Sequence, residues 1–280
     1  MGLGGYLTWT AVAREIRALV GNHIKLLPVE KHGHFLKIIT SEVFDNNPDF
    51  FLACDESHKN QMVFPIILNN PTVNYCKQDT TERAYHRFDS HIIEQACEYY
   101  GIENPELKCV INLTNEEKTF AEDFHQSSLG GKDFLAIEPF SKDNYTHNRE
   151  YPLDKWQSIV NDLHDDIMIV QVGTGAKALK NVVDLRGQTT FRQALALIGR
   201  SNLFLAPESG LVHGATAVNT KSLVIITGYQ AEKMVAYPQN INVNIGSHGP
   251  CGLKIACHQC QEDAQKHDWH EIVDIVRAEL

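Results

Sequence analysis

The chain has 280 residues, of which 43% are hydrophobic and 21% charged, so we expect folded domains rather than a disordered chain. Its formal net charge of -10 argues against a nucleic-acid-binding protein, which normally carries a basic face. No apolar run reaches the length of a membrane span, and the glycine-rich N-terminus reaches Arg14 too early for a signal peptide. The seven cysteines therefore favour reduced thiols in the cytoplasm.

The first half of the chain predicts alternating helices and strands. Over 6–20, Trp9, Val12 and Ile16 recur at helical spacing, and Gly21 is a natural stop. Further helices are expected at 91–100 and 115–124, and short strands at 24–29, 50–54, 62–68 and 107–113. Gly2 to Gly5 form a glycine loop that leads into the first helix. Such a loop normally follows a strand, and this numbering does not contain that strand.

The second half gives a clearer alternation. Strands are expected at 134–138, 167–172, 182–185, 203–206 and 222–227, and helices at 153–163, 190–198, 211–218 and 269–280. This order indicates a parallel sheet with right-handed crossovers, in which ligands lie beyond the carboxyl ends of the strands. Gly173, Glu208 and Gly228 fall at such ends.

The most informative stretch is 206–213, with the sequence APESGLVH. An apolar strand stops there, turns through Ser209 and Gly210, and opens a helix whose first N–H groups lack partners. Such a helix N-terminus binds anions, and phosphate groups in particular. Glu208 and His213 flank it with an acceptor and a potential cation. The alternative is that Ser209 only caps the helix and that His213 is a core residue.

A second glycine pattern is discounted. Residues 173–178 read GTGAKA and fit a dinucleotide-binding fingerprint. The next strand begins near Val182, however, which leaves too few residues for a helical crossover. Gln193 also stands where an acidic residue is expected. The turn at Gly173 and Thr174 is instead interpreted as a loop that contacts a base or ribose, or as a plain loop.

Four segments together resemble glycosyltransferase family 9, the family of the lipopolysaccharide heptosyltransferases. Residues 184–192 (DLRGQTTFR) and 207–215 (PESGLVHGA) resemble its donor-side signature. Residues 149–156 (REYPLDKW) are similar to its K-x-W-P-type helix entry, and 2–7 (GLGGYL) to its N-terminal G-x-G-D-x-L loop. The resemblance is strong from about 138 to 226 and weak from 35 to 106.

The resemblance implies an α/β GT-B fold, in which two Rossmann-like domains with parallel sheets face a cleft. We expect an acceptor-side domain at 1–130, which would lack its first strand, a nucleotide-sugar domain at 131–262, and a C-terminal packing helix at 263–280. The implied activity is metal-independent, inverting transfer of a heptose-like sugar from ADP-heptose or a similar donor. The acceptor would be a glycan or a lipid-linked saccharide, as in lipopolysaccharide synthesis, with peripheral membrane contact as one option.

The resemblance also assigns donor-binding roles. Arg149 matches the family's phosphate-binding lysine, and its guanidinium can pair with two phosphate oxygens. Ser209 and Gly210 would offer hydrogen-bond donors to the diphosphate, with His213 nearby. Glu208 would accept hydrogen bonds from ribose or sugar hydroxyls. Gly173 and Thr174 complete the expected donor site.

One departure concerns catalysis, because Gly5 matches the position of the family's catalytic aspartate and cannot accept a proton. The base is therefore unassigned, with Asp45 and Asp55 as candidates elsewhere in the N-terminal domain. The first alternative is a non-catalytic relative that binds a nucleotide-sugar. An epimerase with the same fold is a more distant one.

The C-terminal region holds a cluster of potential metal ligands. Cys251, Cys257 and Cys260 include a C-x-x-C spacing, and they lie among His248, His258, His267 and His270. The two interpretations are a structural metal remote from the chemistry, and plain reduced thiols. We expect no cofactor to be required for catalysis.

Overall fold

The structure is a computed structural model that describes residues 2–51, 62–70, 82, 88–140 and 145–280. In its N-terminal part, α1 (Leu3–Val20) packs on a sheet of strand order β2-β1-β3. There β1 (Ile24–His32) runs parallel to β3 (Met62–Ile67) and antiparallel to β2 (Phe35–Ile38). A short 3-10 helix, η1 (Glu42–Phe44), and α2 (Ile92–Glu98) complete this part.

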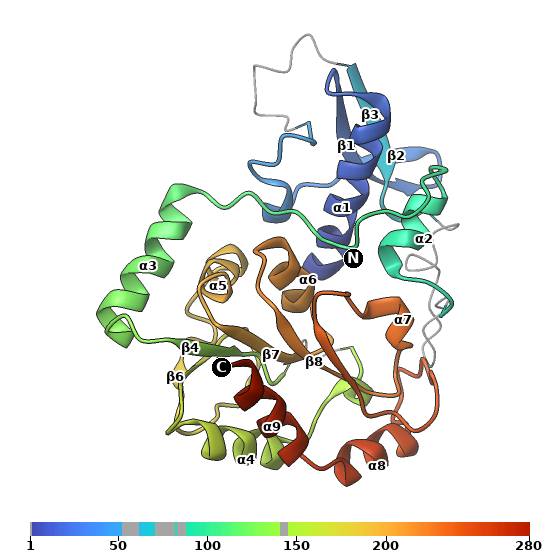
Figure 1. Ribbon diagram of the computed structural model, residues 1–280. Helices are drawn as coiled ribbons and strands as arrows, with labels where there is room; N and C mark the ends of the chain where they lie inside the picture. The colour runs from blue at the N-terminus through green and yellow to red at the C-terminus, as the bar shows by residue number, and fades with distance from the viewer. Residues whose placement is uncertain (1, 52–61, 71–81, 83–87, 141–144) are drawn as a thin grey trace.

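The C-terminal part contains a six-stranded parallel sheet of order β6-β5-β4-β7-β8-β9 (Figure 1). Its strands are β4 (Phe134–Ile137), β5 (Met168–Gln171), β6 (Val183–Asp184), β7 (Leu203–Pro207), β8 (Ser222–Ile226) and β9 (Ile241–Asn244). Its helices are α3 (Asn115–Leu129), α4 (Leu153–Leu163), α5 (Phe191–Ile198), α6 (Gly210–Ala217), α7 (Glu232–Val235), α8 (His258–Lys266) and α9 (His270–Glu279). The predicted α/β class with parallel strands is confirmed, and no helix lies between β5 and β6, as expected for the discounted glycine pattern.

Alternate residues of the central strands face two apolar cores. Phe204 and Ala206 of β7 belong to a core that α1, α5 and α6 share, whereas Leu203 and Leu205 face α4 and α9. The first core extends from the six-stranded sheet into the N-terminal part, so the two parts are joined by buried apolar contacts. The division at residues 130 and 262 stays a prediction.

Local sequence signals fix several helix ends. His91 and Glu94 form a capping box at α2, as do Thr114 with Glu117 at α3 and Thr190 with Gln193 at α5. At the other end of α3, Gly130 takes the left-handed conformation at φ 62°, which glycine adopts without strain.

The expected strand at 107–113 is wrong. The segment is extended, but side chains of two helices bind its backbone where a neighbouring strand would otherwise do so. Thr10 of α1 accepts from Val110 N at 2.8 Å, and Thr216 of α6 accepts from Cys109 N at 3.2 Å. The apolar pattern of 107–113 therefore reflects burial of this segment between the two parts of the molecule, not membership of a sheet.

Four elements were not expected: β2, β9, α7 and α8. β2 is exposed on every residue and therefore lacks an apolar alternation. Of the strand expected at 50–54, Phe50 makes an isolated bridge to Leu26, and 52–54 lie outside the described residues.

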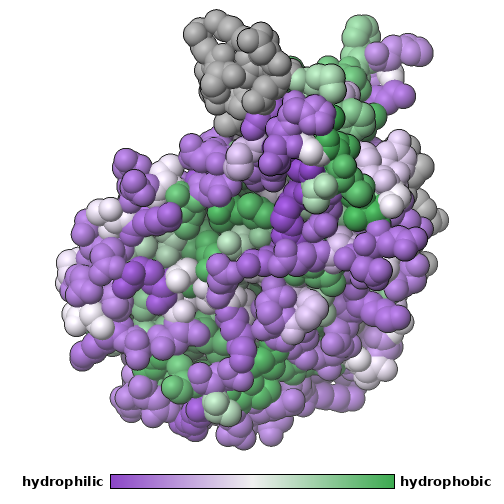
Figure 2. Space-filling model, turned by 45° about the horizontal axis from the view of Figure 1, so that its top comes forward, coloured by the Kyte–Doolittle hydropathy of each residue, from purple (hydrophilic) through white to green (hydrophobic). Residues whose placement is uncertain are grey.

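Large apolar side chains are exposed on the N-terminal sheet. They include Phe35, Leu36 and Ile38 of β2 and Met62, Val63 and Phe64 of β3. Figure 2 shows apolar surface along the projecting part of the molecule that contains this sheet. Among the described residues, no helix has both the length and the apolar character that crossing a membrane requires.

Candidate functional site

The N-termini of α1 and α6 meet at two glycines, on the side where the N-terminal part covers the sheet (Figure 1). A Cβ atom on Gly4 would lie 2.8 Å from Cα of Gly210, so neither helix tolerates a larger residue at this contact without moving. Each helix directs the positive end of its dipole and its unpartnered N–H groups to this point. The expected glycine loop is wrong, because Gly4 and Gly5 lie in the first turn of α1. Their helix N-terminus meets the Ser209–Gly210 turn, and we call this meeting point the anion corner, a candidate site for an anion.

Ser209 is the N-cap residue of α6 and links this helix to the carboxylate of Glu138. Its hydroxyl oxygen accepts from Val212 N at 3.4 Å, and the hydroxyl donates to Oε2 of Glu138, at the end of β4. The sequence analysis did not single out Glu138. Strands β4 and β7 are neighbours in the sheet, so Glu138 and Glu208 follow strands that end side by side.

Glu208 is the most poorly satisfied group of the site. It is 4% exposed, and neither of its oxygens accepts a hydrogen bond from any residue that the structure describes. Its one ion pair runs from Nη1 of Arg149 at 3.8 Å, which is longer than a hydrogen bond. A buried carboxylate of this kind is costly unless a ligand supplies donors.

Arg149 ends the 3-10 helix η4 (His147–Arg149) and lies beside a pair of aromatic rings. Its guanidinium carbon is 5.1 Å from the ring centroid of Tyr145 and 6.0 Å from that of Tyr229. Cation–π contacts of this kind favour the charged guanidinium at this position.

Burial controls the ionisation of the site. It raises the pKa of Glu138 and of Glu208 to about 7, although the charge of Arg149 partly opposes both shifts. Burial and Arg149 together lower the pKa of His213 to about 4. At neutral pH, His213 is therefore uncharged, and the two carboxyl groups are partly protonated.

His213 belongs to a buried network at the same corner. Its Nδ1 lies 2.6 Å from the hydroxyl of Tyr237, which also lies 3.4 Å from Sγ of Cys109. The ring of His91 packs edge-on against Tyr237, and burial lowers its pKa to about 3. The sequence left two interpretations of His213, a residue of the anion site and a core residue. In the structure it lies at the anion corner and is also held by core residues.

The other two expected donor residues lie at the edge of the site. Gly173 has φ 93°, and a Cβ there would lie 3.1 Å from Oε1 of Glu138. Thr174 is exposed. The structure thus brings together five of the expected donor residues: Arg149, Glu208, Ser209, Gly210 and His213. Gly173 lies against Glu138, which in turn contacts Ser209.

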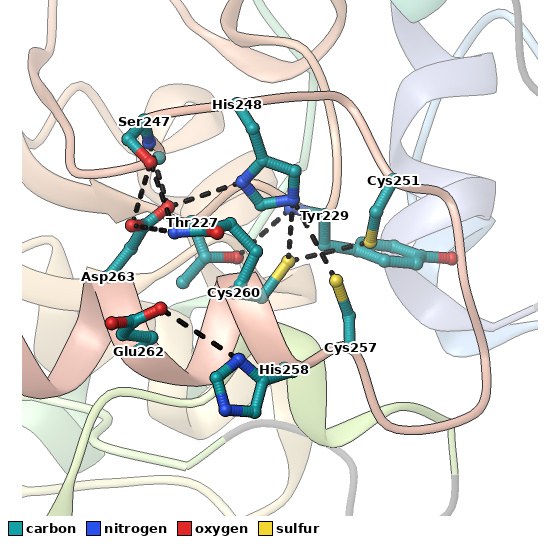
Figure 3. A network of polar contacts seen from close by, with 12 residues as sticks. Thr227, Tyr229, Ser247, His248, Cys251, Cys257, His258, Cys260, Glu262 and Asp263 are labelled. Carbon is teal, nitrogen blue, oxygen red and sulfur yellow. Dashed lines mark hydrogen bonds and ion pairs between the residues drawn. The ribbon is translucent and has the colours of Figure 1, made fainter.

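The C-terminal cysteines form a separate cluster with one histidine (Figure 3). The ligand atoms of His248, Cys251, Cys257 and Cys260 all lie within 4.8 Å of one another. Sγ of Cys251 and Cys260 are 3.4 Å apart, and Nε2 of His248 is 3.7 Å from Sγ of Cys257 and of Cys260. Tetrahedral bonds of about 2.3 Å to sulfur and about 2.0 Å to nitrogen imply edges of roughly 3.5–3.8 Å, so the four groups fit a metal ion.

A second shell of contacts orients this cluster. Nδ1 of His248 lies 3.2 Å from Oδ2 of Asp263, which leaves Nε2 directed at the sulfurs. Asp263 also accepts hydrogen bonds from the backbone and hydroxyl of Ser247. A carboxylate behind a histidine is the usual support for a metal ligand. His258 points away from the sulfurs towards Glu262 (Figure 3). His267 contacts Tyr151, and His270 contacts Asp268.

The cluster is not remote from the anion corner, contrary to expectation. The backbone N–H of Cys257 donates to Oδ1 of Asn148 at 2.9 Å, and Asn148 precedes Arg149. A cavity of about 350 Å³ opens beside the cluster, with Gln230, Lys233 and His248 in its wall. A second, of about 450 Å³, lies between α3 and α5. Arg149, Glu208 and Ser209 line neither of these two cavities.

Comparison with known proteins agrees with this geometry. The model of glycosyltransferase family 9 (heptosyltransferase) matches residues 81–264. No curated protein matches the sequence. Among solved structures, a family 9 glycosyltransferase from Veillonella parvula superposes with a TM-score of 0.68 at 11% identity, covering 100% of this chain and 94% of that one.

Two further structures contain sugar-nucleotides. TibC from enterotoxigenic Escherichia coli, an iron-containing dodecameric heptosyltransferase in complex with ADP-D-beta-D-heptose, has a TM-score of 0.63 at 12% identity, with 100% and 74% coverage. Escherichia coli WaaC with ADP-2-deoxy-2-fluoro heptose has a TM-score of 0.56 at 9% identity, with 100% and 98% coverage. At such identities these structures show the shared GT-B fold. The family model covers more than half of this chain. The chain therefore belongs to glycosyltransferase family 9 and is a heptosyltransferase-like glycosyltransferase.

Proposed function

We propose that the protein transfers a heptose-like sugar from ADP-heptose or a similar nucleotide-sugar to a glycan or lipid-linked saccharide, with inversion. The observation that carries this proposal is the anion corner, where two helix N-termini and Arg149 face a buried carboxylate, Glu208, that accepts no hydrogen bond from a described residue. The sugar-nucleotides bound to TibC and WaaC favour ADP-linked donors.

The charges of the corner support a transfer step that uses no metal ion. A departing diphosphate needs positive charge, and preorganised dipoles and cations supply it most effectively in a buried site. Arg149 would pair with phosphate oxygens while the first N–H groups of α6 bind the others. Glu208 would accept hydroxyl groups of the sugar or ribose, and Glu138 would hold Ser209 in place. Gly173 and Thr174 would lie along the nucleotide.

The catalytic base is proposed to be Glu30, at the end of β1. Burial, and after it the charge of Glu30, raises the pKa of Tyr6, so this carboxylate lies near the residue that follows Gly5. Glu30 also lies 3.3 Å from His32 and is only partly exposed. Asp45 is exposed at the end of η1, and Asp55 lies outside the described residues.

The second candidate is a protein that binds the donor without transferring its sugar, and Gly5 favours it. General-base help contributes about 10²–10⁴ in rate. If Glu30 does not supply that help, donor binding will be easy to detect and transfer very slow. In that case Gly5→Asp should raise transfer.

We further propose that the Cys/His cluster holds a structural metal ion through His248, Cys251, Cys257 and Cys260. Four protein ligands leave no position for a substrate, and three thiolates with one imidazole suit Zn²⁺ or iron. TibC is described as iron-containing. The five described cysteines form no disulfide, which favours a reducing, cytoplasmic location.

A lipid-linked acceptor would bring the protein to a membrane surface, and we propose the β1–β2 hairpin as the contact. Phe35 and Leu36 are 79% and 52% exposed, and Lys31 and Lys37 lie beside them. Apolar and cationic groups together suit an anionic bilayer surface. Co-sedimentation with anionic vesicles should fall when Phe35 and Leu36 are changed to serine.

The deciding experiment measures donor binding and transfer separately. Calorimetry with ADP-heptose and other nucleotide-sugars identifies the donor, and release of ADP with an acceptor mixture reports transfer. Glu30→Gln should reduce transfer by 10²-fold or more without weakening donor binding. Exposed Glu98→Gln on α2 is the control. Failure of every nucleotide-sugar to bind would refute the proposed function.

A further inference from the structure

The loop between Cys251 and Cys257 wraps the side chain of Asn148. Nδ2 of Asn148 donates to the carbonyl oxygens of Leu253 at 2.6 Å and Ile255 at 2.8 Å. Its Oδ1 accepts from Cys257 N at 2.9 Å. Asn148 is 2% exposed, so these bonds do not compete with bulk water.

The backbone around Asn148 is held by further contacts. Thr146 caps η4 by accepting from Asn148 N at 3.2 Å and donates to the carbonyl oxygen of Leu253 at 3.0 Å. The carbonyl oxygen of Asn148 accepts from the hydroxyl of Thr227 at 2.7 Å. Arg149 is the next residue, so the turn that carries the guanidinium depends on the Cys251–Cys257 loop.

The same loop reaches Arg149 from its aromatic side. Cys251 N donates to the carbonyl oxygen of Gly228 at 2.9 Å, and Gly252 N to that of Tyr229 at 3.0 Å. The ring of Tyr229 is one of the two that lie within 6.0 Å of the guanidinium carbon (Figure 3 shows this ring beside Cys251). Both the backbone of Arg149 and one wall of its side chain are therefore fixed by residues bracketed by metal-ligand cysteines.

The loop has no helix or strand of its own to keep it in this shape. Apart from a single β-bridge at Leu253 and a backbone hydrogen bond from Lys254 N to Glu82 O, it is irregular until α8 begins at His258. Ordering such backbone costs conformational entropy residue by residue. Linking Cys251, Cys257 and Cys260 to a single ion would close the loop onto α8. The free energy of metal binding would then offset the entropy lost in ordering the loop.

We propose that occupancy of the Cys/His cluster sets the donor affinity of the enzyme, with Asn148 as the positioning residue between the metal loop and Arg149. The proposal rests on the proposed donor site and metal site. The metal ion would touch neither donor nor acceptor. Binding at one site would order the segment that the other site needs, so the two affinities would be coupled.

The first test compares ADP binding by calorimetry in the protein stripped of metal and after reloading with one equivalent of Zn²⁺. We expect the reloaded protein to bind ADP at least tenfold more tightly. By reciprocity, saturating ADP should raise the affinity for Zn²⁺ by the same factor, as measured by competition with a chromogenic chelator. Equal ADP affinity in the two forms would overturn the proposal. No ADP binding in the reloaded form would instead refute the donor site.

The second test keeps the metal in place, so it decides the matter even if the stripped protein unfolds. Asn148→Ala should retain stoichiometric zinc by elemental analysis and lose at least tenfold in ADP affinity. In the Arg149→Ala background the same change should have little further effect, because Asn148 acts through Arg149. Asn161→Ala, on the exposed face of α4, is the matched control. Equal losses with and without Arg149 would show that Asn148 only supports the general fold.

Discussion

Two clusters of ionisable side chains lie near the same edge of the six-stranded sheet, and they are built in opposite ways. Around His248, the ligand atoms lie at the separations expected between ligands of one tetrahedral metal ion. Asp263 contacts the other ring nitrogen of His248 and fixes the ring. Around Glu208, the carboxylate is buried with one long ion pair to Arg149. The members of the first cluster contact one another, whereas the second bears an electrostatic cost that a ligand would relieve. A closed cluster stabilises a fold, and an unsatisfied one prepares a site for binding.

The largest expected effect is on stability at the metal cluster. Cys260→Ser removes a buried thiol at the centre of the group, and loss of a structural metal is among the few changes that cost more than about 4 kcal/mol. Thermal unfolding of the metal-loaded protein should shift strongly downwards, and elemental analysis should show loss of the ion. An unchanged melting temperature would mean that the cysteines are plain thiols.

The next effect concerns donor binding at the unsatisfied cluster. Arg149→Ala removes a charge-assisted contact worth about 1.5–3 kcal/mol, so the Kd for ADP should rise roughly tenfold to a hundredfold. Arg277→Ala on α9, whose exposed guanidinium pairs with Asp166, is the comparison variant. Undiminished affinity in calorimetry would remove Arg149 from the site.

Glu208→Gln should stabilise the unliganded protein, in contrast to any change at the cysteines. The folded pKa of Glu208, about 7, exceeds its unfolded value, so its favourable contribution is complete below about pH 4.5 and is lost as pH rises through 7. At pH 8 the variant should gain about 1–2 kcal/mol in free energy of unfolding, and near pH 5 almost nothing. Urea unfolding at the two pH values checks this, and a gain of equal size at both would exclude ionisation as its cause.

The smallest effect is the pH dependence of affinity. Glu138 and Glu208 lose protons near pH 7, which adds negative charge beside the diphosphate and draws Arg149 towards Glu208. Binding of the identified nucleotide-sugar, whose diphosphate does not titrate in this range, should weaken about tenfold or less between pH 6 and pH 8. The Glu208→Gln variant should show a flatter profile, and a steeper one would contradict the assignment.

The sequence predicted those parts of the site that depend on short stretches of chain. The turn at Ser209 and Gly210 follows from a local pattern within a few residues, whereas Arg149 was assigned through the family resemblance. Glu138 and Asn148 were missed because their partners are distant in sequence: Glu138 meets Ser209, and Asn148 meets Leu253. His248 was one of four neighbouring histidines, and only the path of the chain shows that it, rather than His258, faces the sulfurs.

The fold shows the same division between local and distant information. Strands such as β5 and β7 are buried on both faces and have a continuous apolar pattern, which indicates their position in a parallel sheet. The segment at 107–113 is also apolar, but hydroxyls on α1 and α6 take the place of neighbouring strands. No feature of its own sequence distinguishes these two kinds of partner.

The contact between Gly4 and Gly210 has a consequence for how such an enzyme can diversify. Main chain meets main chain there, so at this one point the approach of α1 to α6 is limited by backbone atoms. Loops of the N-terminal part can then change to admit a different acceptor while the reach between the two substrates stays constant. The backbone contact between the two glycines would thus allow acceptor specificity to change without changing the geometry of transfer.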